Sequence, residues 1–290
     1  PMRQARPAAS LLLFGLLLSP LGRALPHPAG PTAARPGPAG SASPAAIEAE
    51  RMRVETSDGK LLIGDFYAPP AKKSAEERAP AALLVHGAGG DRAAFATLAE
   101  ALARSGMAVL AIDLRGHGES ASADYAFQSL DEAARANLWT FAVRDLQAAV
   151  QWLRAQPGVH GAALNLFGHG EGASLATHYA LGDETVRSLV LLEPHAGAAF
   201  AAPVFDLVED LRQLEGLPLK LVTQRGQKAQ LDALLTALDE PAWLEVEVQK
   251  STETGLLGDK RLAKSWAQWS SDRSAGRAPA AAAAPAQRSR

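Results

Sequence analysis

The feature that most constrains the fold of this chain is the alternation of short apolar runs with longer amphipathic segments. The runs at 83–85, 109–112, 164–167 and 189–192 consist almost entirely of Leu, Val, Ile, Ala and Phe. Such continuous runs are typical of strands that are covered on both faces. Strands that alternate with helices predict a mainly parallel sheet with helices on both of its faces.

The pattern predicts eight strands and six helices. Strands are expected at 52–55, 61–67, 82–86, 108–113, 163–167, 188–193, 220–223 and 244–249. Helices are expected at 93–104, 138–155, 171–181, 229–238 and 260–269, with a short one at 205–214. The first two strands are the more polar, and Asp58 and Gly59 between them indicate a hairpin at an antiparallel edge of the sheet.

Both ends of the chain differ from its middle. A basic start, the apolar run at 11–18 and small residues before position 25 predict a signal peptide over 1–24. The run is too short to span a bilayer, so we expect no transmembrane segment in the mature chain and export to the periplasm or the cell exterior. Two segments should be disordered, a linker rich in Pro, Ala and Gly over 25–46 and a tail rich in Ala, Pro and Arg over 272–290. One domain is then expected over 47–271.

Composition excludes several functions. The chain has no Cys, so it has no disulfide, thiolate metal site or Cys nucleophile. The first 46 residues carry four Arg and no acid, and the last 19 carry four Arg and one Asp, so the net charge of −2 conceals −9 on residues 47–271. An acidic domain argues against nucleic-acid binding. No pattern in the sequence predicts a cofactor.

Three Gly-rich turns follow predicted strands, at 86–90, 113–120 and 168–172. In sheets of this kind ligands bind at the carboxyl ends of the strands, which is where these turns lie. Together they resemble the turns of α/β-hydrolases of the dienelactone-hydrolase or serine-aminopeptidase kind. The resemblance implies a three-layer α/β-hydrolase fold, with a mostly parallel twisted sheet of about eight strands and helices on both faces. Only about 22 residues (196–217) separate the sixth and seventh strands, so the cap should be minimal.

The resemblance assigns roles to residues of two of these turns. His86, Gly87 and Ala88 correspond to the family's oxyanion loop, where the backbone N–H of Ala88 would point into the site. His169, Gly170 and Glu171 correspond to the G-x-S-x-G nucleophile elbow, and they complete the predicted pocket.

The resemblance breaks at the catalytic triad. Gly170 stands where the family carries its serine, so no acyl-enzyme can form there. Gln227 or its neighbours replace the acid, and Thr252 replaces the histidine. No His follows His195, so the expected general base is absent. These losses predict a pseudo-hydrolase that binds a small molecule or a protein partner.

Two alternatives stay open. Glu193 and His195 lie at the end of the sixth strand and could serve as a displaced acid and base in a hydrolase of esters or small acyl substrates. His195 could instead share a metal with His169, although their spacing matches no known metal motif and no metal site is predicted. The second alternative is a purely structural or assembly module.

Overall fold

The computed structural model describes residues 47–70, 77–195, 204–250 and 255–275. The predicted signal peptide, the linker and most of the predicted tail lie outside these residues. No helix among the residues described is long and apolar enough to cross a membrane.

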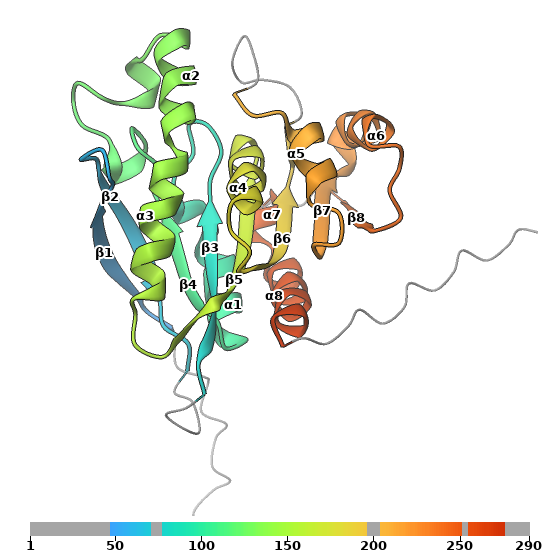
Figure 1. The fold of residues 1–290 in the computed structure, drawn as a ribbon, viewed down its shortest axis with the longest axis horizontal. Coiled ribbons are helices and arrows are strands. Elements are labelled where there is room, and N and C mark those ends of the chain that lie inside the picture. Colours follow the sequence, from blue (N-terminus) through green and yellow to red (C-terminus); the bar gives the residue numbers. More distant parts are fainter. Residues whose placement is uncertain (1–46, 71–76, 196–203, 251–254, 276–290) are drawn as a thin grey trace, which may run out of the picture. The chain divides into compact units, whose positions relative to one another are not determined.

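An eight-stranded open sheet forms the centre of the domain, with the strand order β1-β2-β4-β3-β5-β6-β7-β8 (Figure 1). β1 and β2 form the predicted hairpin, and β2 also pairs antiparallel with β4. All remaining pairs are parallel. The strands are β1 (Ala49–Glu55), β2 (Leu61–Tyr67), β3 (Ala79–Val85), β4 (Ala108–Ile112), β5 (Val159–His169), β6 (Val186–Leu192), β7 (Leu219–Gln224) and β8 (Leu244–Gln249). The predicted fold class is confirmed.

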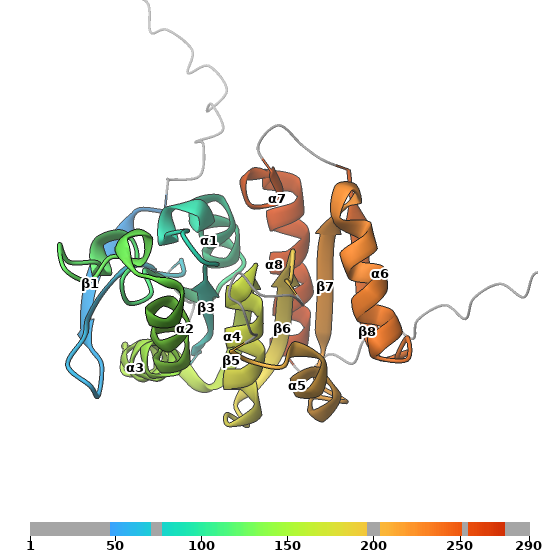
Figure 2. The ribbon, with the colours of Figure 1, turned by 90° about the horizontal axis from the view of Figure 1, so that it is seen from above.

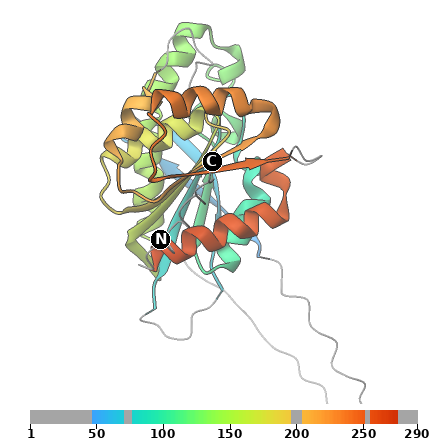
Figure 3. The same cartoon turned by 90° about the vertical axis from the view of Figure 1, so that its right-hand side faces the viewer.

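Helices cover both faces of the sheet. The α-helices are α1 (Ala96–Arg104), α2 (Glu132–Phe141), α3 (Val143–Arg154), α4 (Glu171–Leu181), α5 (Leu207–Gln213), α6 (Lys228–Ala237), α7 (Gly255–Gly258) and α8 (Lys260–Ser274). Four short 3-10 helices are η1 (Arg92–Phe95), η2 (Gly118–Ser120), η3 (Phe127–Ser129) and η4 (Arg225–Gln227). Seen from above, α1, α7 and α8 lie on one face of the sheet and α3, α4 and α5 on the other (Figure 2). Figure 3 shows α6 and α8 on opposite faces next to β8.

The core is divided by the sheet into two apolar clusters. The larger cluster joins one face of the strands to α2–α6 and includes Trp139, Leu175 and Leu211. The smaller cluster joins the other face to α1, α7 and α8 and is centred on Phe95 and Trp266, which are fully buried. Burial on both sides explains why the central strands are continuous runs of hydrophobic residues.

Several predicted element ends differ by a few residues from those observed, and two of the differences have a clear structural reason. The helix predicted at 138–155 is two helices, α2 and α3, that meet at Ala142. The domain was predicted to end at residue 271, but α8 continues to Ser274. The last turn of α8 is held by polar contacts that composition does not reveal, since the hydroxyl of Ser274 donates to the side chain of Asn165 at 2.9 Å.

The register of the parallel strands brings their carboxyl ends to one level. Val85 of β3 is opposite Gly168 of β5. His169 is opposite Leu192 of β6, which is in turn opposite Val222 of β7. The turns that follow these strands therefore converge on one edge of the sheet.

Candidate functional site

The turn between β5 and α4 contains three glycines that the structure requires for two different reasons. A Cβ at Gly168 would collide with the backbone of Ala173, and one at Gly172 would collide with the carbonyl oxygen of His86. These two glycines let α4 lie close against the ends of β5 and β3. Gly170 has room for a side chain, but its φ of 58° and ψ of −124° are a conformation that other residues adopt only under strain.

Beside Gly170 lies a carboxylate–imidazole pair. A Cβ at position 170 would be 3.8 Å from both Nδ1 and Cε1 of His195. His195 Nδ1 lies 3.0 Å from Oε1 of Glu171, while Oε2 of the same carboxylate accepts a hydrogen bond from the backbone N–H of Ala88 at 2.9 Å. One side chain thus connects the start of α4, the loop after β3 and the end of β6.

The contacts of this pair shift both pKa values. Burial would raise the pKa of Glu171, but hydrogen bonds from His195 and from the backbone N–H of Ala88 outweigh burial and hold it below its usual range. The hydrogen bond to Glu171 raises the pKa of His195, against the opposing effect of burial. The contact therefore stabilises the anionic form of Glu171 and the protonated form of His195 relative to the isolated side chains.

A second pair lies next to the first. His169 Nε2 is 3.2 Å from Oε2 of Glu193, whose other oxygen accepts from the side-chain amide of Gln224 at 2.7 Å. Glu193 has a positive φ of 47°, which is uncommon for a residue with a side chain. These contacts, with the hydrogen bond from His169 foremost, hold the pKa of Glu193 below its usual range.

The two candidate residues after β6 are therefore brought to the same edge but into different pairs. Glu193 contacts His169, and His195 contacts Glu171. Among the residues described, no group of three or more His, Asp and Glu side chains is arranged to hold a metal ion. These contacts give no geometric support to a single site in which Glu193 acts on His195. They also give none to a metal shared by His169 and His195.

The oxyanion-like loop is held from behind by His86. Its Nε2 accepts the backbone N–H of Leu114 at 3.0 Å, so Nδ1 carries the proton and donates to the carbonyl of Gly87 at 2.8 Å. Burial and the neighbouring His117 lower the pKa of His86 to about 3. His86 is therefore a neutral, buried support of the loop, and Ala88 provides the loop's contact with the site.

Gln227 and Thr252 are the two other positions that the resemblance assigns to the triad. Gln227 ends η4 after β7, and the nearby side chain that reaches the strand-end cluster is Gln224. Thr252 lies outside the residues described.

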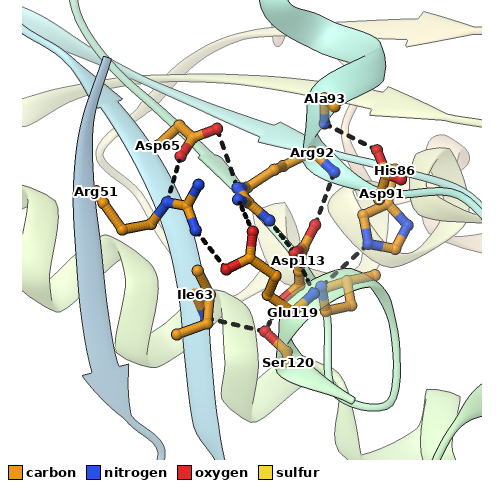
Figure 4. Close-up of polar contacts among 11 residues, drawn as sticks. Arg51, Ile63, Asp65, His86, Asp91, Arg92, Ala93, Asp113, Glu119 and Ser120 are labelled. Carbon is orange, nitrogen blue, oxygen red and sulfur yellow. Dashed lines mark hydrogen bonds and ion pairs between the residues drawn. The ribbon is translucent and has the colours of Figure 1, made fainter.

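One buried network near the site was missed in the sequence. Asp113, at the end of β4, is fully buried and accepts the backbone N–H groups of Arg92 and Glu119, each at 2.8 Å (Figure 4). Its carboxylate also pairs with the guanidinium of Arg92, which contacts Asp65 of β2 at 3.0 Å. Arg51 of β1 extends the network to Asp65 and Glu119. The network fixes the loops after β3 and β4. Its members come from four distant segments, so no local motif marks it.

Comparison with known proteins decides the family. The model of the serine aminopeptidase S33 family matches residues 76–253, well over half of the chain. The chain belongs to this family. The resemblance inferred from the Gly-rich turns is confirmed.

Relatives in sequence carry no stated activity. An uncharacterized protein of Mycobacterium tuberculosis, present in two strains, is 32% identical over 163 residues, which are 56% of this chain and 52% of that protein. The chain thus spans about half the length of the curated relatives it matches.

Solved structures share the α/β-hydrolase fold. Dienelactone hydrolase from Anabaena variabilis superimposes with a TM-score of 0.57 at 19% identity, covering 79% of this chain and 97% of that one. An acylaminoacyl peptidase from Pyrococcus horikoshii has a TM-score of 0.60 at 14% identity, covering 79% of this chain and 42% of that one. The esterase Pf2001 from Pyrococcus furiosus has a TM-score of 0.56 at 16% identity, covering 82% and 94%. At these identities the likeness concerns the fold.

Proposed function

We propose that this protein is a non-catalytic member of its hydrolase family that binds a small molecule at the carboxyl ends of the strands. The observation that carries the proposal is Gly170, which has the backbone conformation of the elbow and no side chain to attack a substrate. Without a nucleophile at this turn, the two-step acyl-transfer route of serine hydrolases has no first step.

Two further features support the proposal. The backbone N–H of Ala88, which would stabilise an oxyanion in the family, is hydrogen-bonded to the carboxylate of Glu171. The resemblance places the acid after β7, and the side chain that reaches the cluster from this end of the strand is the neutral amide of Gln224, its last residue. With Gln227 and Thr252 at the positions that correspond to the acid and the histidine, the triad is degenerate at every member.

A fluorophosphonate probe tests the loss of the nucleophile, because it labels only serines activated by a base. We expect no labelling of the full chain, and no turnover of short-chain p-nitrophenyl esters above the buffer rate. An active serine esterase serves as the positive control. Stoichiometric labelling of one serine of this chain would refute the proposal.

Ligand binding is proposed because a charged cluster is kept at the strand ends. His169 and His195 are 31% and 40% exposed in their side chains, while their carboxylate partners are mostly buried. Such partly exposed polar groups at the carboxyl edge of a parallel sheet are typical of ligand sites. A thermal-shift screen of small polar metabolites should give a hit that moves the amide resonances of Ala88 and Gly170. A screen without a hit, together with no detectable partner, would favour a structural or assembly role.

A second candidate function is hydrolysis of esters or small acyl substrates through a general base. It is favoured by His195, whose imidazole lies beside Gly170 and is oriented by the Glu171 carboxylate. In that reaction the neutral form of His195 would take a proton from the water whose oxygen attacks the acyl carbon. It would then give the proton to the leaving alkoxide oxygen, which departs as the alcohol. The reaction predicts ester turnover that falls by about 100-fold or more in His195→Ala. Turnover that is unchanged in His195→Ala and in a chelator would exclude both the base and a metal.

Export is proposed from the basic and apolar pattern of residues 1–24. Expression of the full chain in a bacterial host, followed by fractionation and N-terminal sequencing, should find the domain outside the cytoplasm and shortened near residue 24. Retention of the intact N-terminus in the cytoplasm would contradict export.

A further inference from the structure

In this fold a negatively charged oxygen is bound by the backbone N–H of the residue after the elbow and by one from the loop after β3, and the corresponding residues here are Glu171 and Ala88. The backbone N–H of Ala88 donates to Oε2 of Glu171 at 2.9 Å. An internal carboxylate therefore already occupies the Ala88 donor that a ligand oxygen would use.

The carboxylate is held there from the opposite side by His195. Oε1 of Glu171 lies 3.0 Å from Nδ1 of His195, and the Glu171 side chain is 14% exposed. A glycine makes room for it, because a Cβ at Gly87 would lie 2.9 Å from Oε2 of Glu171. The positive end of the α4 dipole adds a favourable interaction with an anion at this place.

These contacts exceed what a helix cap requires. A capping side chain satisfies amides of its own helix, whereas Glu171 reaches the loop after β3 and the end of β6. Its carboxylate occupies the Ala88 amide that a carbonyl or carboxylate ligand would contact at this position.

We propose that Glu171 is an internal plug of the oxyanion position, latched by His195, so that the strand-end site is closed in its resting state. A ligand oxygen enters only when the Glu171 carboxylate leaves the Ala88 amide. In the proposed function, the plug would regulate when the strand-end site can bind its ligand, and this role of the plug rests on that function. The plug itself would hold for a catalytic chain as well.

Acetate tests the plug, because it has the same chemical group as the Glu171 side chain. In Glu171→Ala, acetate should bind to the vacated amides and cause saturable changes in the resonances of Ala88 and of residue 171. We expect its apparent affinity to be about tenfold or more above that of the wild-type chain, which is the effect expected for removing one competing charge-assisted hydrogen bond. The measurement is an NMR titration of the full chain at constant ionic strength with chloride as the counter-titrant.

Glu193→Ala is the matched control. It removes the carboxylate of the neighbouring pair, which does not contact Ala88, so acetate should leave the Ala88 resonance as it is in the wild-type chain. If Glu171→Ala does not fold, Glu171→Gln keeps the shape and removes the charge, and acetate should then compete with the weaker neutral acceptor.

Three results would overturn the plug. They are equal acetate binding in the wild-type chain and the Glu171 variant, no response of Ala88 in a folded variant, and an equal gain in Glu193→Ala. None of these depends on fluorophosphonate labelling, which reports on a nucleophile. The plug and the proposed loss of catalysis can therefore fail independently.

Discussion

Replacing Gly170 by Ala tests the cost of the elbow's backbone conformation, because alanine adds a Cβ but no reactive group. A Cβ at this position would have Gly87 Cα at 3.7 Å and the His195 ring at 3.8 Å, which are ordinary contact distances. Steric collision therefore contributes little. The φ of 58° and ψ of −124° remain, and a non-glycine residue in this region costs about 1–3 kcal/mol.

We therefore expect Gly170→Ala to lower the free energy of unfolding by about 1–3 kcal/mol. For a domain of this size each kcal/mol corresponds to about 2–4 °C in Tm. Gly182 ends the same helix with a φ of −99°, and a Cβ there would meet only the Tyr179 carbonyl at 3.8 Å. Gly182→Ala should be neutral or stabilise the domain by up to about 1 kcal/mol, because alanine restricts the unfolded chain.

Urea titrations of both variants at pH 7 measure the difference directly. The reasoning is wrong if Gly170→Ala is as stable as the wild-type chain, or if both glycine variants lose the same amount. Gly172→Ala provides a further comparison, because its Cβ would collide with the His86 carbonyl. It should therefore be less stable than Gly170→Ala.

Three other predictions follow from buried or strained groups near the site. Burial lowers the pKa of His86 to about 3. Between pH 6.5 and about pH 3 this side chain is therefore protonated in the unfolded chain and neutral in the folded one. Stability should thus fall with acidification by about 1.4 kcal/mol per pH unit, or about 2 kcal/mol at pH 5, and urea titrations should find this component missing in His86→Gln. Glu193 has a φ of 47°, so Glu193→Gly should be more stable than Glu193→Ala by about 1 kcal/mol in the same assay; equal stability would contradict the strain. Asp113→Asn should cost about 3–5 kcal/mol, because it breaks a buried ion pair with Arg92 and turns an amide NH2 toward one of two backbone N–H groups. Calorimetry of the exposed Asp232→Asn should show a loss below about 1 kcal/mol.

The fold was predictable because the central strands are buried on both faces. Continuous apolar runs located these strands, and two of the other strands, Leu61–Tyr67 and Leu244–Gln249, have the predicted ends. The helix ends were harder. The break between α2 and α3 at Ala142 has no Pro or Gly to mark it, and the last turn of α8 depends on Ser274 contacting Asn165, 109 positions away in the chain.

The location of the candidate site residues at one edge of the sheet was predictable from the sequence, but the pairing of their side chains was not. Gly-rich turns identified Ala88, Gly170 and Glu171 as neighbours because parallel strands end at one edge. Which carboxylate contacts which imidazole depends on the exit angles of the chain after β5 and β6. The positive φ of Glu193 sets one of these angles, and no local pattern in the sequence signals it.

The glycine at the elbow also affects how this site can evolve. In a serine enzyme of this fold the strained nucleophile lowers stability and is maintained because the activity is selected. Glycine removes that strain, and the gain in stability lets the domain tolerate other destabilising mutations. A return to serine at Gly170 would then reduce stability by about 1–3 kcal/mol before any activity was regained. The proposed loss of the nucleophile would thus be hard to reverse, because folding favours the change from serine to glycine and opposes the change back.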